Sequence, residues 1–156
     1  MNIDEQIQVL VDEASRYGIE PTDIDLIAPV LRSIAEQLQH PQYYVLQNLE
    51  QQWLMTTLAD RTQPEVTKTV LHAFPSLEAA KASTNALNDF QLVASPIPTV
   101  HLLFQMLAMK PIDSIVFLET SANLQSGKEL SRQNLQTLIE QHLLRQRSAN
   151  IPPDIA

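Results

Sequence analysis

The sequence predicts an α+β fold, with an antiparallel sheet of about four to five strands that is packed by helices and preceded by an N-terminal helical hairpin. Three observations support this prediction. Apolar residues recur at helical spacing through the first 40 residues. Aromatic and β-branched residues then gather in short runs. The last third contains an apolar helix, a short strand and a long amphipathic helix, in that order.

The first predicted helix has its apolar residues on one face, at Ile3, Ile7, Leu10, Val11, Ala14 and Tyr17. Asn2 and Glu5 are spaced as a capping pair, and Gly18 lies just past the expected end. The second helix has a longer apolar stripe, formed by Leu26, Ile27, Val30, Leu31, Ile34, Ala35 and Leu38. Two short helices are marginal in isolation, so their stripes must be covered by the chain's own sheet or by a second subunit.

The start of the second helix is marked by Asp25, which we expect to be its cap. Pro29 has no N–H to donate, so the regular part of the helix is expected to begin near Leu26 or to kink there. Both helices place acidic residues outside and aliphatic residues inside. Residues 1–40 are therefore predicted to form a hairpin that must pack on another part of the fold.

Residues 43–47, 53–58 and 66–74 are rich in aromatic and β-branched residues, and they predict three strands of an antiparallel meander. Ser76 is placed to cap a helix over residues 77–83. A fourth strand follows near residues 90–94, and we expect Pro96 and Pro98 to end it.

The last third begins with Thr99, the expected cap of a helix over residues 100–109 that is apolar nearly all round and should be buried on more than one side. A strand at residues 112–119, a loop containing Gly127 and a helix over residues 131–147 complete the order. The tail, residues 148–156, is expected to be extended or mobile. The predicted organisation is thus a hairpin appendage (1–40), an α+β domain (41–147) and a tail.

Composition excludes several classes of function. The 156 residues contain no cysteine, so neither a disulfide nor a thiolate site is expected. No apolar run approaches the roughly 18 to 20 residues that span a bilayer. The net charge is -8, and residues 1–60 hold ten acidic residues against two basic ones, which makes nucleic acid an improbable partner. The sequence predicts a soluble, cytoplasmic protein without membrane insertion.

No motif for catalysis or metal binding is recognisable. The four histidines, at His40, His72, His101 and His142, are not spaced as metal ligands. Ser95, His101 and Glu119 are conceivable as a hydrolytic triad, but no Gly-x-Ser-x-Gly turn exposes a nucleophile. Gly127-Lys128 lacks the upstream glycine of a P-loop. We therefore expect no catalytic, cofactor-binding or metal-binding residue and no cofactor.

Two other groups of residues permit a structural and a functional interpretation. Glu20, Asp23 and Asp25 would attract a hard cation, but capping and the helix dipole explain them and a calcium loop needs more oxygen ligands. Tyr43, Tyr44 and Trp53 form either an aromatic binding surface or a sheet face in the core, and we favour the core.

Several of these motifs occur together in one known family. Phe74-Pro75-Ser76 leads into Leu77-Glu78-Ala79-Ala80, and a strand at 112–117 is followed by Gly127-Lys128-Glu129-Leu130-Ser131. Over about residues 42–146 this order resembles the N-terminal domain of the bacterial SseB family, named after enhanced serine sensitivity. Where that family tends to have Asn-Pro after the last strand, this chain has Glu119-Thr120-Ser121-Ala122. The resemblance implies an α+β fold of unsettled biochemical role, with no catalytic residues.

Together these observations favour a non-catalytic interaction or regulatory module of a bacterium, acting as a homodimer or with a protein partner. The alternative is a small-ligand-binding domain with a pocket between the sheet and the helix at residues 100–109. A hydrolase ranks third. A flat exposed apolar patch would favour the first interpretation, and an apolar cleft with a few convergent polar groups would favour the second.

Overall fold

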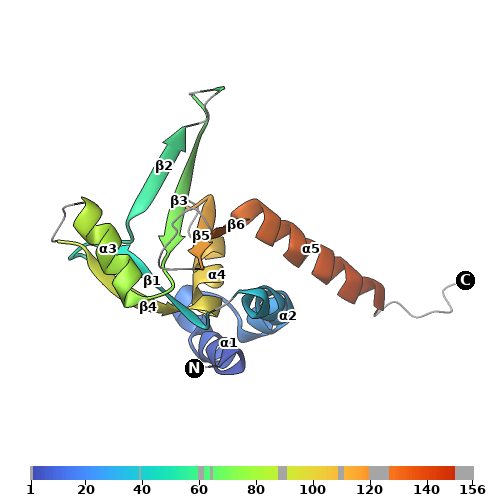
Figure 1. Ribbon diagram of the computed structural model, residues 1–156. Coiled ribbons are helices and arrows are strands. Elements are labelled where there is room, and N and C mark those ends of the chain that lie inside the picture. Colours follow the sequence, from blue (N-terminus) through green and yellow to red (C-terminus); the bar gives the residue numbers. More distant parts are fainter. Residues whose placement is uncertain are drawn as a thin grey trace, which may run out of the picture.

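A computed structural model describes residues 2–38, 40–59, 62–63, 65–87, 91–108, 111–119 and 127–149, and it confirms the α+β fold (Figure 1). The helices within these ranges are α1 (Ile3–Asp12), the 3-10 helix η1 (Ala14–Tyr17), α2 (Pro21–Gln37), α3 (Leu77–Leu87), α4 (Thr99–Ala108) and α5 (Arg132–Ala149). The strands are β1 (Gln42–Gln47), β2 (Met55–Ala59), β3 (Thr67–Ala73), β4 (Val93–Pro98), β5 (Ser114–Leu118) and β6 (Gly127–Ser131). None of the described helices is long and apolar enough to cross a bilayer.

The strands form two sheets where the sequence predicted one antiparallel sheet. β1 pairs with β4, and the other sheet has the order β2-β3-β5-β6. The predicted meander is wrong in one respect, because β1 does not form a ladder with β2. Instead β1 bonds to the residues just before β2, through an isolated bridge between Gln47 and Trp53 and a hydrogen bond of 2.8 Å from the Leu54 N–H to the Leu46 carbonyl. The β3–β5 pair is parallel, whereas the β2–β3 and β5–β6 pairs are antiparallel.

β1 and β2 follow one another along the same side of β3. Two backbone hydrogen bonds of 2.8 Å join Tyr44 of β1 to Phe74, just past the end of β3. Further along that side, β2 pairs with the first part of β3. The outer edge of β1 is covered by β4, and β2 lies at the edge of its sheet. The β2–β3 hairpin projects from the body of the molecule (Figure 1).

The core lies on both faces of the four-stranded sheet. On one face, Leu71, Ala73, Ile115 and Phe117 join a cluster that includes α1, α2 and α4 and extends to Leu135 and Ile139 of α5. On the other face, Phe74 and Leu118 pack with Leu46 and with the alanines of α3. As predicted, α4 is buried on more than one side, with its buried residues at Thr99, Val100, Leu102, Leu103, Phe104 and Met106.

The N-terminal helices follow the prediction except at the start of the second. The side chain of Asn2 accepts a hydrogen bond of 2.8 Å from the Glu5 N–H, and Gly18 adopts the left-handed conformation with φ 69°. α2 begins at Pro21 and contains Pro29, so Asp25 lies within the helix and does not cap it. Proline is favoured in the first helical turn, where its missing N–H costs nothing, and this explains the earlier start.

The hairpin is tied to the rest of the chain by the buried side chain of Gln6, which is 1% exposed. Its amide donates a hydrogen bond of 2.8 Å to the carbonyl of Pro41. Its carbonyl oxygen accepts one of 2.9 Å from the N–H of Val100, at the start of α4. The hydroxyl of Thr99, predicted to cap α4, instead donates to the carbonyl of His40 at 2.7 Å. The start of α4 is therefore satisfied by α1 and not by its own cap.

Three further predictions need correction. Pro96 lies within β4 and does not end it, although Pro98 is the last residue of the strand, as predicted. Pro96 fits there because the N–H and C=O groups of Tyr44, the residue opposite it in β1, bond to Phe74 and point away from β4. The backbone nitrogen of Pro96 therefore faces the outer edge of β4, where no N–H is needed. Gly127 begins strand β6, where a loop was predicted, and α5 starts at Arg132. Of the predicted tail, residues 148–149 belong to α5 and residues 150–156 lie outside the described residues.

Candidate functional site

The four histidines lie on different parts of the fold. His72 is in β3 and His101 in α4, where its Nε2 atom is 3.3 Å from the Gln6 carbonyl oxygen. His40 lies between α2 and β1 with its ring edge-to-face against Tyr43 at 5.4 Å, and His142 lies in α5. Within the ranges that the structure describes, no three histidine, aspartate or glutamate side chains gather as metal ligands would.

The three residues of the conceivable triad are engaged elsewhere. Ser95 is in β4, opposite Val45. Glu119 follows β5, and its Oε1 atom is 3.4 Å from the ammonium of Lys128. His101 contacts the Gln6 carbonyl, as described above. Ser95, His101 and Glu119 thus lie on three different elements, in β4, in α4 and just after β5.

The remaining sequence candidates have structural roles. Glu20 and Asp23 lie exposed at the start of α2, where acidic side chains favour the helix dipole. Tyr43 is fully buried and its ring packs edge-to-face on Phe117 at 5.1 Å, as the core interpretation predicts. A Cβ atom at Gly127 would lie 2.7 Å from a methyl group of Val116, so the glycine permits close strand packing.

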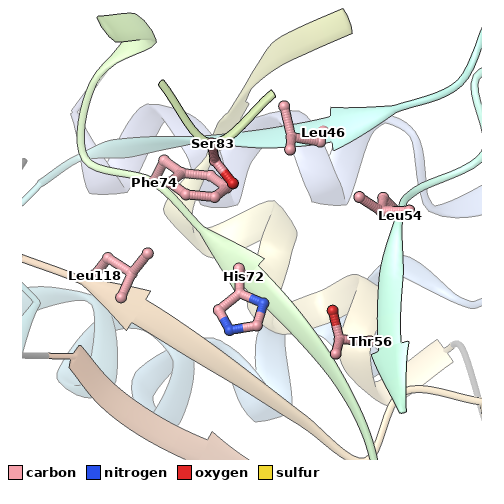
Figure 2. A pocket seen from close by; sticks show the side chains of 7 residues that line it. All are labelled: Leu46, Leu54, Thr56, His72, Phe74, Ser83 and Leu118. Atoms are coloured by element: carbon pink, nitrogen blue, oxygen red, sulfur yellow. The ribbon is translucent and has the colours of Figure 1, made fainter. Parts of the chain in front are cut away.

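A cavity that the sequence did not predict lies on the face of the four-stranded sheet that α3 partly covers. Figure 2 shows the side chain of His72 near the centre of this cavity, with β2 on one side and β5 on the other. The volume is about 220 Å³. We call it the His72 cavity, and it is lined by Leu46, Leu54, Thr56, His72, Phe74, Ser83 and Leu118. α4 packs on the opposite face of the sheet, so this cavity is not the pocket that the sequence suggested.

The His72 cavity has apolar walls and three polar groups: the imidazole of His72 and the hydroxyls of Thr56 and Ser83. Burial lowers the pKa of His72 below its ordinary value of 6.5, so the imidazole is neutral at pH 7. Ligand pockets are usually about 300 to 1,000 Å³. The His72 cavity is smaller, and its volume suits one apolar side chain better than a cofactor or a drug-sized ligand.

The lowered pKa of His72 predicts a loss of stability in mild acid. The folded pKa lies below that of the unfolded chain, so the unfolded state binds the proton more readily once the pH falls below about 6.5. Burial also lowers the pKa of His101, with the same sign. We expect the free energy of unfolding in urea to fall from about pH 7.5 to about pH 5.5. The fall should be smaller in His72→Gln, and an equal fall in both proteins would contradict this explanation.

A second cavity, of about 450 Å³, is polar. Lys68 and Glu129 line it and form an ion pair at 2.7 Å, which lowers the pKa of Glu129. The carboxylate of Asp113 accepts a hydrogen bond of 2.8 Å from the Thr69 N–H and lies 3.9 Å from the guanidinium of Arg132. Each basic group here has an acidic neighbour, so the cavity has no excess charge with which to bind an ion.

The β2–β3 hairpin exposes apolar residues. Leu54, Leu58 and Val66 are 39%, 44% and 48% exposed. Leu58 lies in β2, whereas Leu54 precedes β2 by one residue and Val66 precedes β3 by one residue. In β2, the residues from Thr56 to Ala59 are all exposed. Exposed apolar residues that gather on a projecting element mark a surface for association.

No protein-family model matches the chain, and a search of curated proteins finds no match.

Proposed function

We propose that the protein is a non-catalytic interaction module that contacts its partner through the β2–β3 hairpin. The observation that carries the proposal is the exposure of Leu54, Leu58 and Val66 on this projecting hairpin. An isolated hairpin gains little stability from its own side chains, so exposing apolar residues there is useful chiefly when another surface covers them.

We place this module in the bacterial cytoplasm and propose a distant relationship with the N-terminal domain of the SseB family. The support is the order of the motifs along the chain. Phe74-Pro75-Ser76 joins β3 to α3, where the Ser76 hydroxyl accepts a hydrogen bond of 3.1 Å from the Ala79 N–H. Residues 127–131 form β6.

Small-ligand binding is the second candidate, because three polar groups converge in the His72 cavity. Its volume of about 220 Å³ is below the usual range for ligand pockets, which weighs against this function. The cavity also borders β2, so a partner that covers the hairpin would lie next to it. We therefore treat the His72 cavity as part of the interaction surface.

Co-purification from the native cell tests the proposal. The tagged wild-type chain is compared with Leu58→Glu/Val66→Glu, which places two charges on the hairpin, and with Leu144→Glu, a control at a 60% exposed position on α5. We expect the wild type and the control to retain the same partner and the hairpin variant to lose it. Circular dichroism checks that all three are folded. A partner that all three retain equally, or steady turnover in a broad hydrolase or phosphatase screen, would contradict the proposal.

A further inference from the structure

Of the four strands at the edges of the two described sheets, β1 is bonded on its second side to Phe74 and Leu54, which leaves β2, β4 and β6 with an open edge. Among these three, only the edge of β2 lacks a protecting residue. The edge of β4 contains Pro96 and Pro98, and β6 contains Lys128 and Glu129. β2 has the sequence Met-Thr-Thr-Leu-Ala, without a charge or a proline. Natural proteins usually protect an edge with such residues, because an open edge pairs with other chains. An unprotected edge is therefore a strand-pairing site.

The direction of the free backbone groups in β2 follows from its partner strand. The N–H of Thr69 donates to the Asp113 carboxylate, and its carbonyl accepts from the Asp113 N–H at 2.9 Å. Both groups of Thr69 thus point toward β5, and Thr57, which lies opposite Thr69, points its own groups away from β3. By the same alternation, Met55 and Ala59 also direct their N–H and C=O groups to the open edge.

We propose that this edge pairs with the β2 strand of a second copy of the chain, antiparallel and centred on Thr57. This inference rests on the proposed function and names its partner. In this register Thr57 lies opposite Thr57 of the second copy, and Met55 lies opposite Ala59. All the outward-facing backbone groups then meet one another in hydrogen-bonded pairs. The same patch serves both copies, as a two-fold interface requires, and no charge is brought against a like charge.

The second copy also supplies a side chain to the His72 cavity. The register places Leu58 of the second copy opposite Thr56, as a non-hydrogen-bonded pair whose Cα atoms are about 4.5 Å apart. Thr56 lines the cavity next to Leu54 (Figure 2). In the sequence it is the short residue midway between Leu54 and Leu58. Leu58 of the second copy therefore extends over Thr56 toward His72, and the cavity volume of about 220 Å³ has room for it.

The size of this contact sets the expected affinity. The five residues of β2 span about 17 Å at about 3.4 Å per residue. A pair of such strands with one leucine inserted on each side buries less than the roughly 1,200 Å² of a standard stable interface. The dimer is accordingly weak, and it forms in the micromolar range with rapid exchange of subunits.

Sedimentation velocity of the full chain, from about 1 μM to about 300 μM, tests this pairing across the range of weak association. We expect the wild type to shift from monomer to dimer and Thr57→Pro to remain monomeric. Proline is tolerated there because its missing N–H faces the open edge. Thr57→Ala keeps the N–H and is the control that should still dimerise. Dimerisation of Thr57→Pro at the wild-type concentration would overturn the proposed edge.

The absence of cysteine permits a second test. In a hydrogen-bonded antiparallel pair the Cα atoms are about 5.5 Å apart, within the range for a disulfide. Mild oxidation should therefore link Thr57→Cys chains into a covalent dimer much faster than Ser15→Cys chains, whose exposed thiol lies in η1. Equal rates, or a wild type that stays monomeric throughout, would overturn the second copy as partner. If the Leu58→Glu/Val66→Glu variant still lost its native partner in the co-purification, the proposed function would stand without self-pairing of β2.

Discussion

Replacing Phe104 with alanine is expected to lower the free energy of unfolding by about 3 to 5 kcal/mol, as truncation of a buried aromatic residue does. Phe104 is 3% exposed in α4 and belongs to the main buried cluster, which joins the N-terminal helices to the sheet. The surrounding helices and strands are held by many other contacts, so they cannot close the cavity that the missing ring leaves.

Urea denaturation measures this effect, with Gln105→Ala as the matched control on the same helix. Gln105 is partly exposed, and its truncation should change the free energy of unfolding by less than about 0.5 kcal/mol. Equal midpoints for Phe104→Ala and the wild type would mean that α4 is not central to the core.

Removal of residues 1–39 is expected to abolish cooperative folding. The hairpin contributes a large share of the main buried cluster, including Ile7, Leu10, Ala14, Ile24, Leu31 and Ala35. It also supplies Gln6, whose loss leaves the Val100 N–H without its partner in the interior and removes one of the two donors to the Pro41 carbonyl, the other being the Thr99 N–H. The apolar stripes of the hairpin are covered by the chain's own core, so the truncated chain should expose that core and aggregate.

Light scattering with sizing chromatography tests the effect of the truncation. As a matched control, residues 1–39 are expressed separately and added to the truncated chain. We expect the added fragment to restore a soluble product and a cooperative unfolding transition. A truncated chain that is soluble, unfolds cooperatively and keeps its subunit number would show that the hairpin is dispensable.

Local patterns in the sequence predicted most of the elements correctly. The periodicity of α1, the cap at Asn2 and the left-handed Gly18 are decided by residues within a few positions of one another. α4 and β5 were predictable for a similar reason, because each is a short and nearly continuous apolar run. The α+β class follows once these elements are in order.

The missed features depend on partners far away in the sequence. β6 has one aliphatic residue, Leu130, in five, and it becomes a strand only by pairing with β5. The parallel β3–β5 pair requires the chain to pass through α3, β4 and α4 before it returns, and no local pattern specifies that route. Pro96 was misjudged because whether a strand tolerates a proline depends on which side of that strand is already paired.

The candidate surface was harder to predict than the core. The uncharged composition of β2 is visible in the sequence, but its position at an edge is not. The His72 cavity combines residues from β1, β2, β3, α3 and the end of β5, and the sequence showed only that His72 alternates with Val70 and Phe74 in a strand. Alternation indicates which residues share a face, but it does not show that the face is hollow.

Hydrogen exchange of the β2 amides tests most directly whether the β2–β3 hairpin is the surface that contacts the partner. Exchange is compared between the full chain purified with its bound partner and the same chain alone at high dilution. Our account predicts slower exchange in the bound state at Met55, Thr57 and Ala59, whose N–H groups face the open edge, with no change at Leu144 of α5. Unchanged exchange in β2, with protection confined to the groove between α2 and α5 that Ile34 and Leu138 line, would contradict it.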